Sequence, residues 1–164
     1  MAGRTLLFLD VDGPLIPFGA TSQPYPTYES HLPTGSNPLL SRINPAYGAR
    51  LAALGCELIW ATSWMADAND TICPLLGLPD LPVVIWPGPS ATDKQDERAG
   101  LHWKTRPLVD WAAGRPFIWL DDELTATDRT WVATHHPGEA LLHPVDPRHG
   151  LTDPDFLALH NWLS

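Results

Sequence analysis

The chain has 164 residues. This length fits one ordinary domain, here residues 1–164, which can bury roughly 70% of the surface that its unfolded form exposes. Its 44% hydrophobic and 18% charged residues indicate a globular protein rather than a disordered one. The formal net charge of −9 provides no general attraction for nucleic-acid backbones or anionic membranes, so we expect neither extended nucleic-acid binding nor membrane association.

The few cysteines point to a reducing compartment. Cys56 and Cys73 lie in no metal-binding or redox spacing, which predicts two buried free thiols and favours a cytoplasmic location. The first apolar stretch, residues 6–9, ends at Asp10 and Asp12 and is too short for a signal-peptide core or a membrane span. The histidines show no zinc spacing, so we expect them at the surface.

Continuous apolar runs predict the strands of a sheet that is covered on both faces. They occupy residues 5–9, 57–61, 83–86 and 117–120, with a weaker run at 140–142. Helical periodicity predicts helices at 46–54, 65–76, 101–113, 125–134 and 153–163. Alternating strands and helices imply right-handed βαβ units. We therefore predict an α/β fold: a doubly wound, Rossmann-like, mainly parallel sheet with helices on both faces.

Two segments interrupt this alternation. Residues 13–43 are rich in Pro, Ser, Thr, Gly and Tyr, and a loop of this length indicates an irregular flap or lid. A proline-rich loop that simply packs over the edge of the sheet is the alternative. If the loop contacts substrate, the candidate side chains are Tyr25, Tyr28, His31 and Arg42. The polar segment 87–100 is expected to be an exposed surface loop.

Polar side chains follow three of the predicted strands where each strand ends. They are Asp10 and Asp12 after the first strand, Thr62 and Ser63 after the second, and Asp121 and Asp122 after the fourth. Ligands of open α/β sheets bind at the carboxyl ends of the strands, so we expect these side chains to converge. Carboxylates brought together in a cleft repel each other unless a cation neutralises them. Oxygen ligands of this kind are typical of Mg²⁺.

The same residues resemble the four motifs of the haloacid dehalogenase-like (HAD) superfamily. Residues 8–15, Phe-Leu-Asp-Val-Asp-Gly-Pro-Leu, resemble the first motif, and residues 59–62, Ile-Trp-Ala-Thr, resemble the second. Lys104, near the start of a predicted helix, resembles the third, and Ile-Trp-Leu-Asp-Asp at 118–122 resembles the fourth. Taken alone, each of them is more often an ordinary turn, cap or surface residue. Four in the correct order identify the superfamily.

The resemblance implies a role for each residue. Asp10 would attack phosphorus and become an aspartyl-phosphate, and Asp12 would act as acid and then as base. Asp121 would bind Mg²⁺ together with the Asp10 carboxylate and the Asp12 backbone carbonyl, while Asp122 would bind it directly or through water. The side chains expected to bind phosphate are Thr62, Ser63 and Lys104.

The resemblance also limits the substrate. Neither gap between the motifs holds a full cap domain, and an open site suits a large substrate. The Asp-Gly-Pro-Leu variant and Trp-Ala-Thr-Ser-Trp at 60–64 are similar to the phosphatase-like domains of RNA-repair proteins. These features imply a magnesium-dependent phosphomonoesterase that acts on a nucleotide, an oligonucleotide end or a small phosphorylated metabolite.

Other functions remain as alternatives. A phosphotransferase or a dehalogenase would belong to the same superfamily, although a dehalogenase needs neither Asp12 nor magnesium. A non-catalytic binding module would be expected to lack one of the motif residues, and none is missing. Two tryptophans lie close in the sequence to predicted site residues: Trp64 to Thr62, and Trp103 to Lys104. Each could form part of the pocket wall or pack in the core, and the sequence does not favour either.

Overall fold

The computed structural model describes residues 3–20, 22, 24–28 and 36–164. Four parallel strands form one sheet in the order β2-β1-β3-β4. The strands are β1 Leu6–Leu9, β2 Glu57–Trp60, β3 Phe117–Asp121 and β4 Ala140–Pro144. Because all four run in the same direction, the residues that follow β1, β2 and β3 meet at one edge of the sheet. The predicted α/β, Rossmann-like fold is confirmed.

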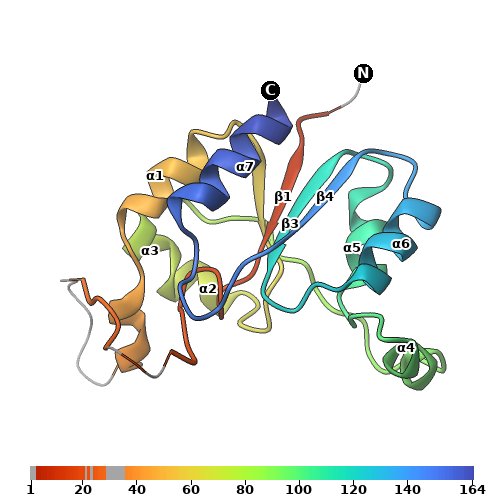
Figure 1. Ribbon diagram of the computed structural model, residues 1–164, viewed down its shortest axis with the longest axis horizontal. Coiled ribbons are helices and arrows are strands. Elements are labelled where there is room, and N and C mark those ends of the chain that lie inside the picture. The colour runs from red at the N-terminus through yellow and green to blue at the C-terminus, as the bar shows by residue number, and fades with distance from the viewer. Residues whose placement is uncertain (1–2, 21, 23, 29–35) are drawn as a thin grey trace.

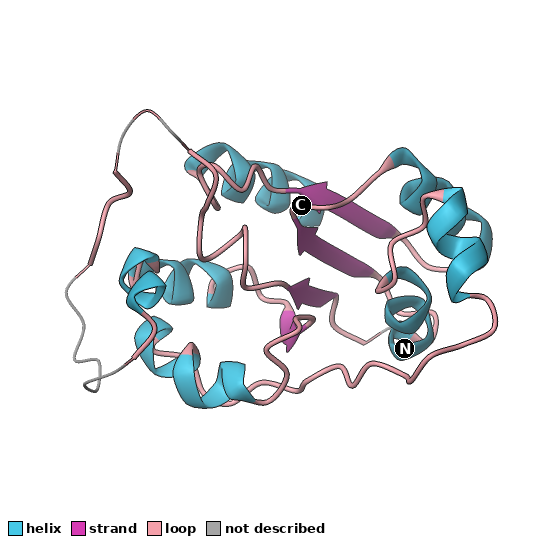
Figure 2. Ribbon diagram, turned by 90° about the horizontal axis from the view of Figure 1, so that it is seen from below, coloured by secondary structure: helices cyan, strands magenta, loops and turns pink. Residues whose placement is uncertain are grey.

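Helices cover both faces of the sheet (Figure 1 and Figure 2). One group comprises α1 Ala46–Ala52, α2 Asp67–Thr71, α3 Cys73–Leu76 and α7 Asp153–Leu163. The other face carries α5 Thr105–Ala112 and α6 Ala126–His135. Two further elements are α4 Asp93–Ala99 and the 3₁₀ helix η1 Pro38–Arg42. The helices at 46–54, 101–113, 125–134 and 153–163 therefore form, with ends that differ from the expected ones by up to four residues.

Alternate side chains of each strand enter two separate hydrophobic cores, as the period of two residues requires. In β1, Leu7 and Leu9 pack with α1, α2, α3 and α7, whereas Leu6 and Phe8 pack with α5 and α6. All four of these side chains are fully buried. Burial on both faces explains why the strands appear in the sequence as continuous apolar runs rather than alternating ones.

The prediction of one continuous helix at 65–76 was wrong. The structure contains two short helices there, α2 and α3, which meet at Ile72. Pro74 has no N–H to donate and its ring would clash with the carbonyl of Asp70 in a continuous helix. At the other end, Met65 adopts a left-handed conformation with φ of 55°, so the helix begins only at Asp67.

The strand predicted at 83–86 was also wrong. Only Val83 forms a bridge with Trp60, supported by hydrogen bonds from Trp60 N to Pro82 O (2.9 Å) and from Val84 N to Trp60 O (3.0 Å). Beyond this point the chain leaves the sheet, and Ile85 is 77% exposed. The segment pairs with β2 at this one point because the prolines at 82 and 87 have no N–H to donate to a ladder of β-sheet hydrogen bonds.

The two irregular segments contain more structure than expected. Residues 93–99 of the predicted surface loop form α4, an exposed helix that buries none of its residues and ends at Gly100 with φ of 81°. Within 13–43, η1 occupies the last part, and Asn37 Oδ1 accepts the amide of Leu39 at its start. His31 lies outside the described residues.

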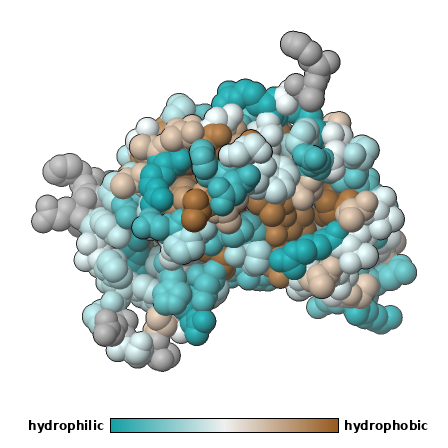
Figure 3. All heavy atoms as spheres, turned by 45° about the horizontal axis from the view of Figure 1, so that its top comes forward, coloured by the Kyte–Doolittle hydropathy of each residue, from teal (hydrophilic) through white to brown (hydrophobic). Residues whose placement is uncertain are grey.

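The surface and the cysteines agree with the composition. The face shown in Figure 3 is largely hydrophilic, with hydrophobic side chains gathered in a patch to the right of its centre. Within the described part of the chain, no helix combines the length and the apolar character that crossing a membrane requires. Cys56 and Cys73 are buried free thiols, as predicted.

Candidate active site

Three carboxylates converge at the carboxyl edge of the sheet. Asp10 follows β1, Asp121 ends β3, and Asp122 comes next in the chain. One oxygen from each lies within 4.8 Å of the others. Asp10 is 7% exposed and Asp121 1% exposed, while Asp122 is half-buried. Hard oxygen donors at this spacing fit the first shell of a divalent cation such as Mg²⁺.

Lys104 lies between two of these carboxylates. Its Nζ is 2.8 Å from Asp121 Oδ2 and 3.3 Å from Asp10 Oδ1, and it donates a further hydrogen bond of 2.9 Å to Ala61 O. The residue is 4% exposed and immediately precedes α5. This helix starts later than predicted because a helix that included Trp103 would place its carbonyl against the ring of Pro107.

The four groups leave an excess of negative charge. If Asp10, Asp121 and Asp122 are all ionised, one lysine neutralises one of three charges and a formal charge of −2 remains. Burial, opposed by Lys104, raises the pKa of Asp10 to about 7, and burial together with Asp121 raises the pKa of Asp122 to about 6. A divalent cation has the charge that would keep these carboxylates ionised.

Asp121 behaves differently from its neighbours. Burial favours its neutral form, but the Lys104 ammonium outweighs that effect and lowers the pKa of Asp121. Its other oxygen, Oδ1, accepts the backbone amide of Glu123 at 3.0 Å. Asp121 is therefore an ionised and fixed carboxylate, which suits a metal ligand.

Asp12 is not part of the carboxylate cluster. Its side chain is exposed, and Oδ2 accepts a hydrogen bond of 3.1 Å from the indole Nε1 of Trp64. Trp64 lies in a tight turn of the backbone. Its amide donates a hydrogen bond of 3.2 Å to Thr62 Oγ1, and the next residue, Met65, has the left-handed conformation. Two carboxyl groups on one strand end thus lie in different environments, which allows them separate chemical roles.

Thr62 and Ser63 differ in accessibility. Thr62 is fully buried after β2, and because its Oγ1 accepts the Trp64 amide, its hydroxyl hydrogen can be donated elsewhere. The Thr62 carbonyl accepts a hydrogen bond of 3.1 Å from Trp86 Nε1. Ser63 is exposed at the same edge of the sheet. Both stand at the strand end where a phosphate would meet the carboxylates.

Gly13 allows the loop after β1 to approach Asp122. Its φ of 103° is unfavourable for other residues, and an added Cβ would lie 2.8 Å from Asp122 Cγ. The glycine of the Asp-x-Asp-Gly sequence therefore brings the first and fourth motifs into contact. The backbone carbonyl oxygen of Asp12, the residue before Gly13, remains a predicted metal ligand.

Aromatic side chains line the cluster near Lys104. Its Nζ lies 5.9 Å from the ring centre of Trp86 and 5.5 Å from that of Trp103, and these two rings pack edge to face. Trp103 is 54% exposed. Trp64 and Trp103, left open between core and pocket wall, thus both lie beside catalytic candidates.

His102 was not singled out from its sequence context and was expected at the surface. Its side chain is only 7% exposed, stacks on Trp103, and accepts the Lys104 amide at 3.1 Å through Nδ1. His136 is likewise buried, so the surface prediction was wrong for both. The proximity of His102 to Lys104 in the chain was the one signal available for it.

Comparison with known proteins identifies a family to which the chain belongs. No curated protein and no solved structure gives a significant match to the chain. A family model described as the HAD domain in Swiss Army Knife RNA repair proteins matches residues 6–156, a span that contains all four motifs. The chain therefore belongs to this family of HAD domains.

Proposed function

We propose that this HAD domain is a magnesium-dependent phosphomonoesterase that works through an aspartyl-phosphate on Asp10. The observation that carries the proposal is the buried group of Asp10, Asp121 and Lys104, with Asp122 alongside. The group combines a nucleophilic carboxylate, a cation-binding pair and an ammonium that offsets charge on a transferring phosphoryl group. The fold alone does not imply this reaction, because the same sheet without these side chains could not catalyse it.

Magnesium would be held by the carboxylates of Asp10, Asp121 and Asp122 and by the backbone carbonyl of Asp12. When bound, it supplies positive charge that orients the phosphate and lowers the energy of the negatively charged transition state. In its absence, burial raises the pKa of Asp10 to about 7, so part of the protein carries a protonated Asp10 at neutral pH. A protonated carboxyl group is a poor nucleophile, so loss of the metal should remove part of the nucleophile as well as the charge that stabilises the transition state.

The chain's own residues would then divide the work. The Asp10 carboxylate attacks phosphorus while Asp12 protonates the leaving oxygen, so the phosphorus–oxygen bond to the leaving group breaks as the bond to Asp10 forms. Asp12 next takes a proton from the water that releases inorganic phosphate and regenerates Asp10. Thr62 and Lys104 would donate hydrogen bonds to phosphate oxygens throughout.

The proposal is tested by phosphate release from an aryl phosphate. We expect release that requires Mg²⁺ and stops when the metal is chelated. Turnover that persists in excess chelator would contradict the mechanism. A panel that adds ribose phosphate, mononucleotides and oligonucleotides with a 3′- or 5′-terminal phosphate then assigns the substrate class. The description of the family as part of RNA-repair proteins supports the nucleic-acid end among these.

Trp64→Phe should expose the role of Asp12. The substitution keeps an aromatic ring against the core but removes the N–H that holds Asp12 Oδ2. We expect release of a poor leaving group, such as an alkyl alcohol, to slow by roughly 10- to 100-fold, a fraction of what a general acid contributes. Release of a good aryl leaving group, which needs little protonation, should be nearly unchanged. Single-turnover measurement of alcohol release separates the two, and an equal loss for both would refute the positioning role.

Two alternatives make different predictions. A phosphotransferase of the same superfamily would pass the phosphoryl group from Asp10 to an alcohol acceptor, and added alcohol would then divert product from inorganic phosphate. A non-catalytic binding module would release no phosphate from any member of the panel. The complete set of Asp10, Asp12, Thr62, Lys104 and Asp121 favours catalysis over the binding module, and the acceptor experiment separates hydrolysis from phosphotransfer.

A further inference from the structure

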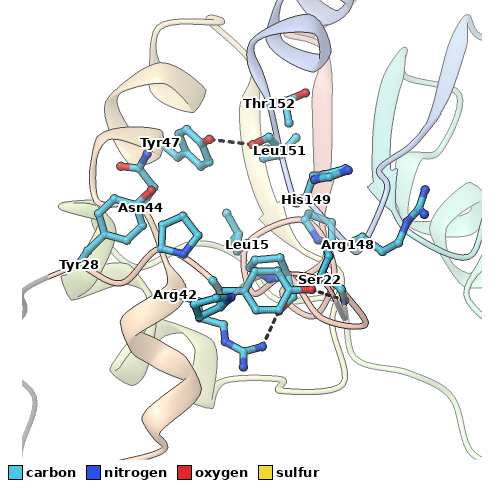
Figure 4. Close-up of a pocket in the computed structure, with 17 residues that line it drawn as sticks. Leu15, Ser22, Tyr28, Arg42, Asn44, Tyr47, Arg148, His149, Leu151 and Thr152 are labelled. Carbon is cyan, nitrogen blue, oxygen red and sulfur yellow. Dashed lines mark hydrogen bonds between the residues drawn. The ribbon is translucent and has the colours of Figure 1, made fainter.

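A pocket of about 400 Å³ lies outside the carboxylate cluster, and no residue of that cluster is among its described lining residues (Figure 4). Its walls come from the segment after β1, from the end of η1 through the start of α1, and from the turn that precedes α7. The volume is within the range of small-molecule and cofactor sites. No function assigned so far to the carboxylate cluster uses this pocket.

The described lining of the pocket is basic, although the protein as a whole is acidic. The described residues that line it include Arg42, Arg148 and His149 but no Asp or Glu, although the chain as a whole has a formal charge of −9. Arg148 is held by Asp146, which accepts two hydrogen bonds from its guanidinium. Arg42 has no carboxylate partner among the described residues, and its NH1 donates to Pro17 O at 2.9 Å. Its remaining N–H groups can bind an anion.

The pocket is also aromatic. All three tyrosines of the chain, Tyr25, Tyr28 and Tyr47, line it. The Tyr47 hydroxyl donates to Leu151 O at 2.7 Å, and the Tyr25 hydroxyl accepts the Ala20 amide at 2.7 Å. The guanidinium of Arg42 lies 4.4 Å from the ring centre of Tyr25. Aromatic rings anchored by their hydroxyl groups, next to an arginine, suit a flat ligand that carries negative charge.

One wall of the pocket begins shortly after Asp12 in the chain. Pro14 and Leu15 form part of its wall, and a compact turn ties them to the strand end, with Leu15 N donating to Val11 O at 3.0 Å. The turn before α7 closes against the same wall, since Leu151 N donates to Pro14 O at 2.9 Å. Asp12 is the residue that would protonate the leaving oxygen. Only Gly13 separates this proton donor from the lining of the pocket in the sequence.

We propose that this pocket binds the nucleotide adjoining the terminal phosphate of a polynucleotide strand. Its base packs against Tyr25, and its phosphodiester group pairs with Arg42. This inference rests on the proposed function, because it takes the terminal phosphate to be at Asp10. It requires only a short basic contact, which agrees with the absence of a general attraction between this acidic chain and nucleic acid.

Binding can be tested without turnover. Fluorescence anisotropy measures the Kd of an end-labelled, terminally phosphorylated trinucleotide in the Asp10→Asn background with magnesium. Adding Arg42→Gln should weaken binding about tenfold and reduce the slope of log K against log salt by about 1. Tyr25→Leu should also weaken binding about tenfold, through lost stacking. Arg129→Gln is the matched control, because Arg129 is exposed on α6, on the opposite side of the sheet (Figure 1).

The outcomes separate the pocket from the chemistry. Equal Kd values for the Arg42 and Arg129 variants, or competition by ribose phosphate as strong as by unlabelled trinucleotide, would overturn the pocket assignment. Aryl phosphatase activity with those results would leave the proposed function intact. Arg42-dependent binding without aryl phosphatase activity would retain the pocket and overturn the chemistry. Ribo- and deoxyribo-trinucleotides, each with a 3′- or a 5′-phosphate, distinguish the two kinds of strand.

Discussion

Asp10→Asn should lower magnesium-dependent phosphate release by at least about 10³-fold, the scale on which loss of a nucleophile acts. The amide keeps the shape of the side chain but cannot attack phosphorus and is a weaker ligand for a hard cation. The kcat for an aryl phosphate should fall, because the loss is in the chemical step. Activity that survives the substitution would remove Asp10 from the mechanism.

The same variant should remain folded. Burial already raises the pKa of Asp10 to about 7, so a neutral group suits the position in the metal-free protein. Above pH 7 the folded wild type must hold a buried charge that the amide does not carry, and the thermal midpoint of Asp10→Asn in chelator should equal or exceed that of the wild type. Asp70→Asn, an exposed change on α2, is the matched control and should leave both activity and midpoint unchanged.

Lys104→Met should cost both stability and activity. The methionine fills similar space, but it leaves the carboxylates of Asp10 and Asp121 without their cation. Removal of one partner from a buried ion pair typically destabilises by about 3–5 kcal/mol. For a chain of this length each kcal/mol lowers the thermal midpoint by about 2–4 °C. Differential scanning calorimetry in chelator measures the change.

The other lysine provides the control for this prediction. Lys94 is exposed on α4, so Lys94→Met should leave the midpoint and the turnover unchanged. Magnesium should raise the thermal midpoint of Lys104→Met part of the way back to that of the wild type, because the metal also neutralises the carboxylates. It should not restore turnover, because the phosphate loses its contact with the ammonium group. Equal midpoints for the two variants in chelator would show that the buried pairs do not stabilise the fold.

The convergence of the site could be predicted because it follows from topology. Asp10, Thr62 and Asp121 each stand at or just after the end of a strand that is buried on both faces, and parallel strands bring their carboxyl ends to one edge. The contact between Asp12 and Trp64 could not be predicted in the same way. It depends on the left-handed turn at Met65, and a methionine gives no local signal for such a turn.

The errors in the fold have local causes. Helix α4 buries none of its residues and lacks the apolar stripe by which a helix is recognised. Residues 83–86 are apolar enough for a strand, but pairing depends on the flanking prolines as well as on hydrophobicity. The pocket that contains Tyr25, Arg42 and Arg148 joins segments more than one hundred residues apart, and no short-range pattern reports such a contact.

Direct detection of the phosphorylated residue tests the central claim most sharply. Asp12→Asn removes the base that would release phosphate, so an aryl phosphate with a good leaving group should trap the intermediate. After an acid quench and proteolysis, mass spectrometry should find one phosphoryl group, on Asp10, that is lost on treatment with hydroxylamine. Phosphorylation of another residue, or turnover by the wild type with no covalent phosphate at Asp10 in either protein, would contradict the account.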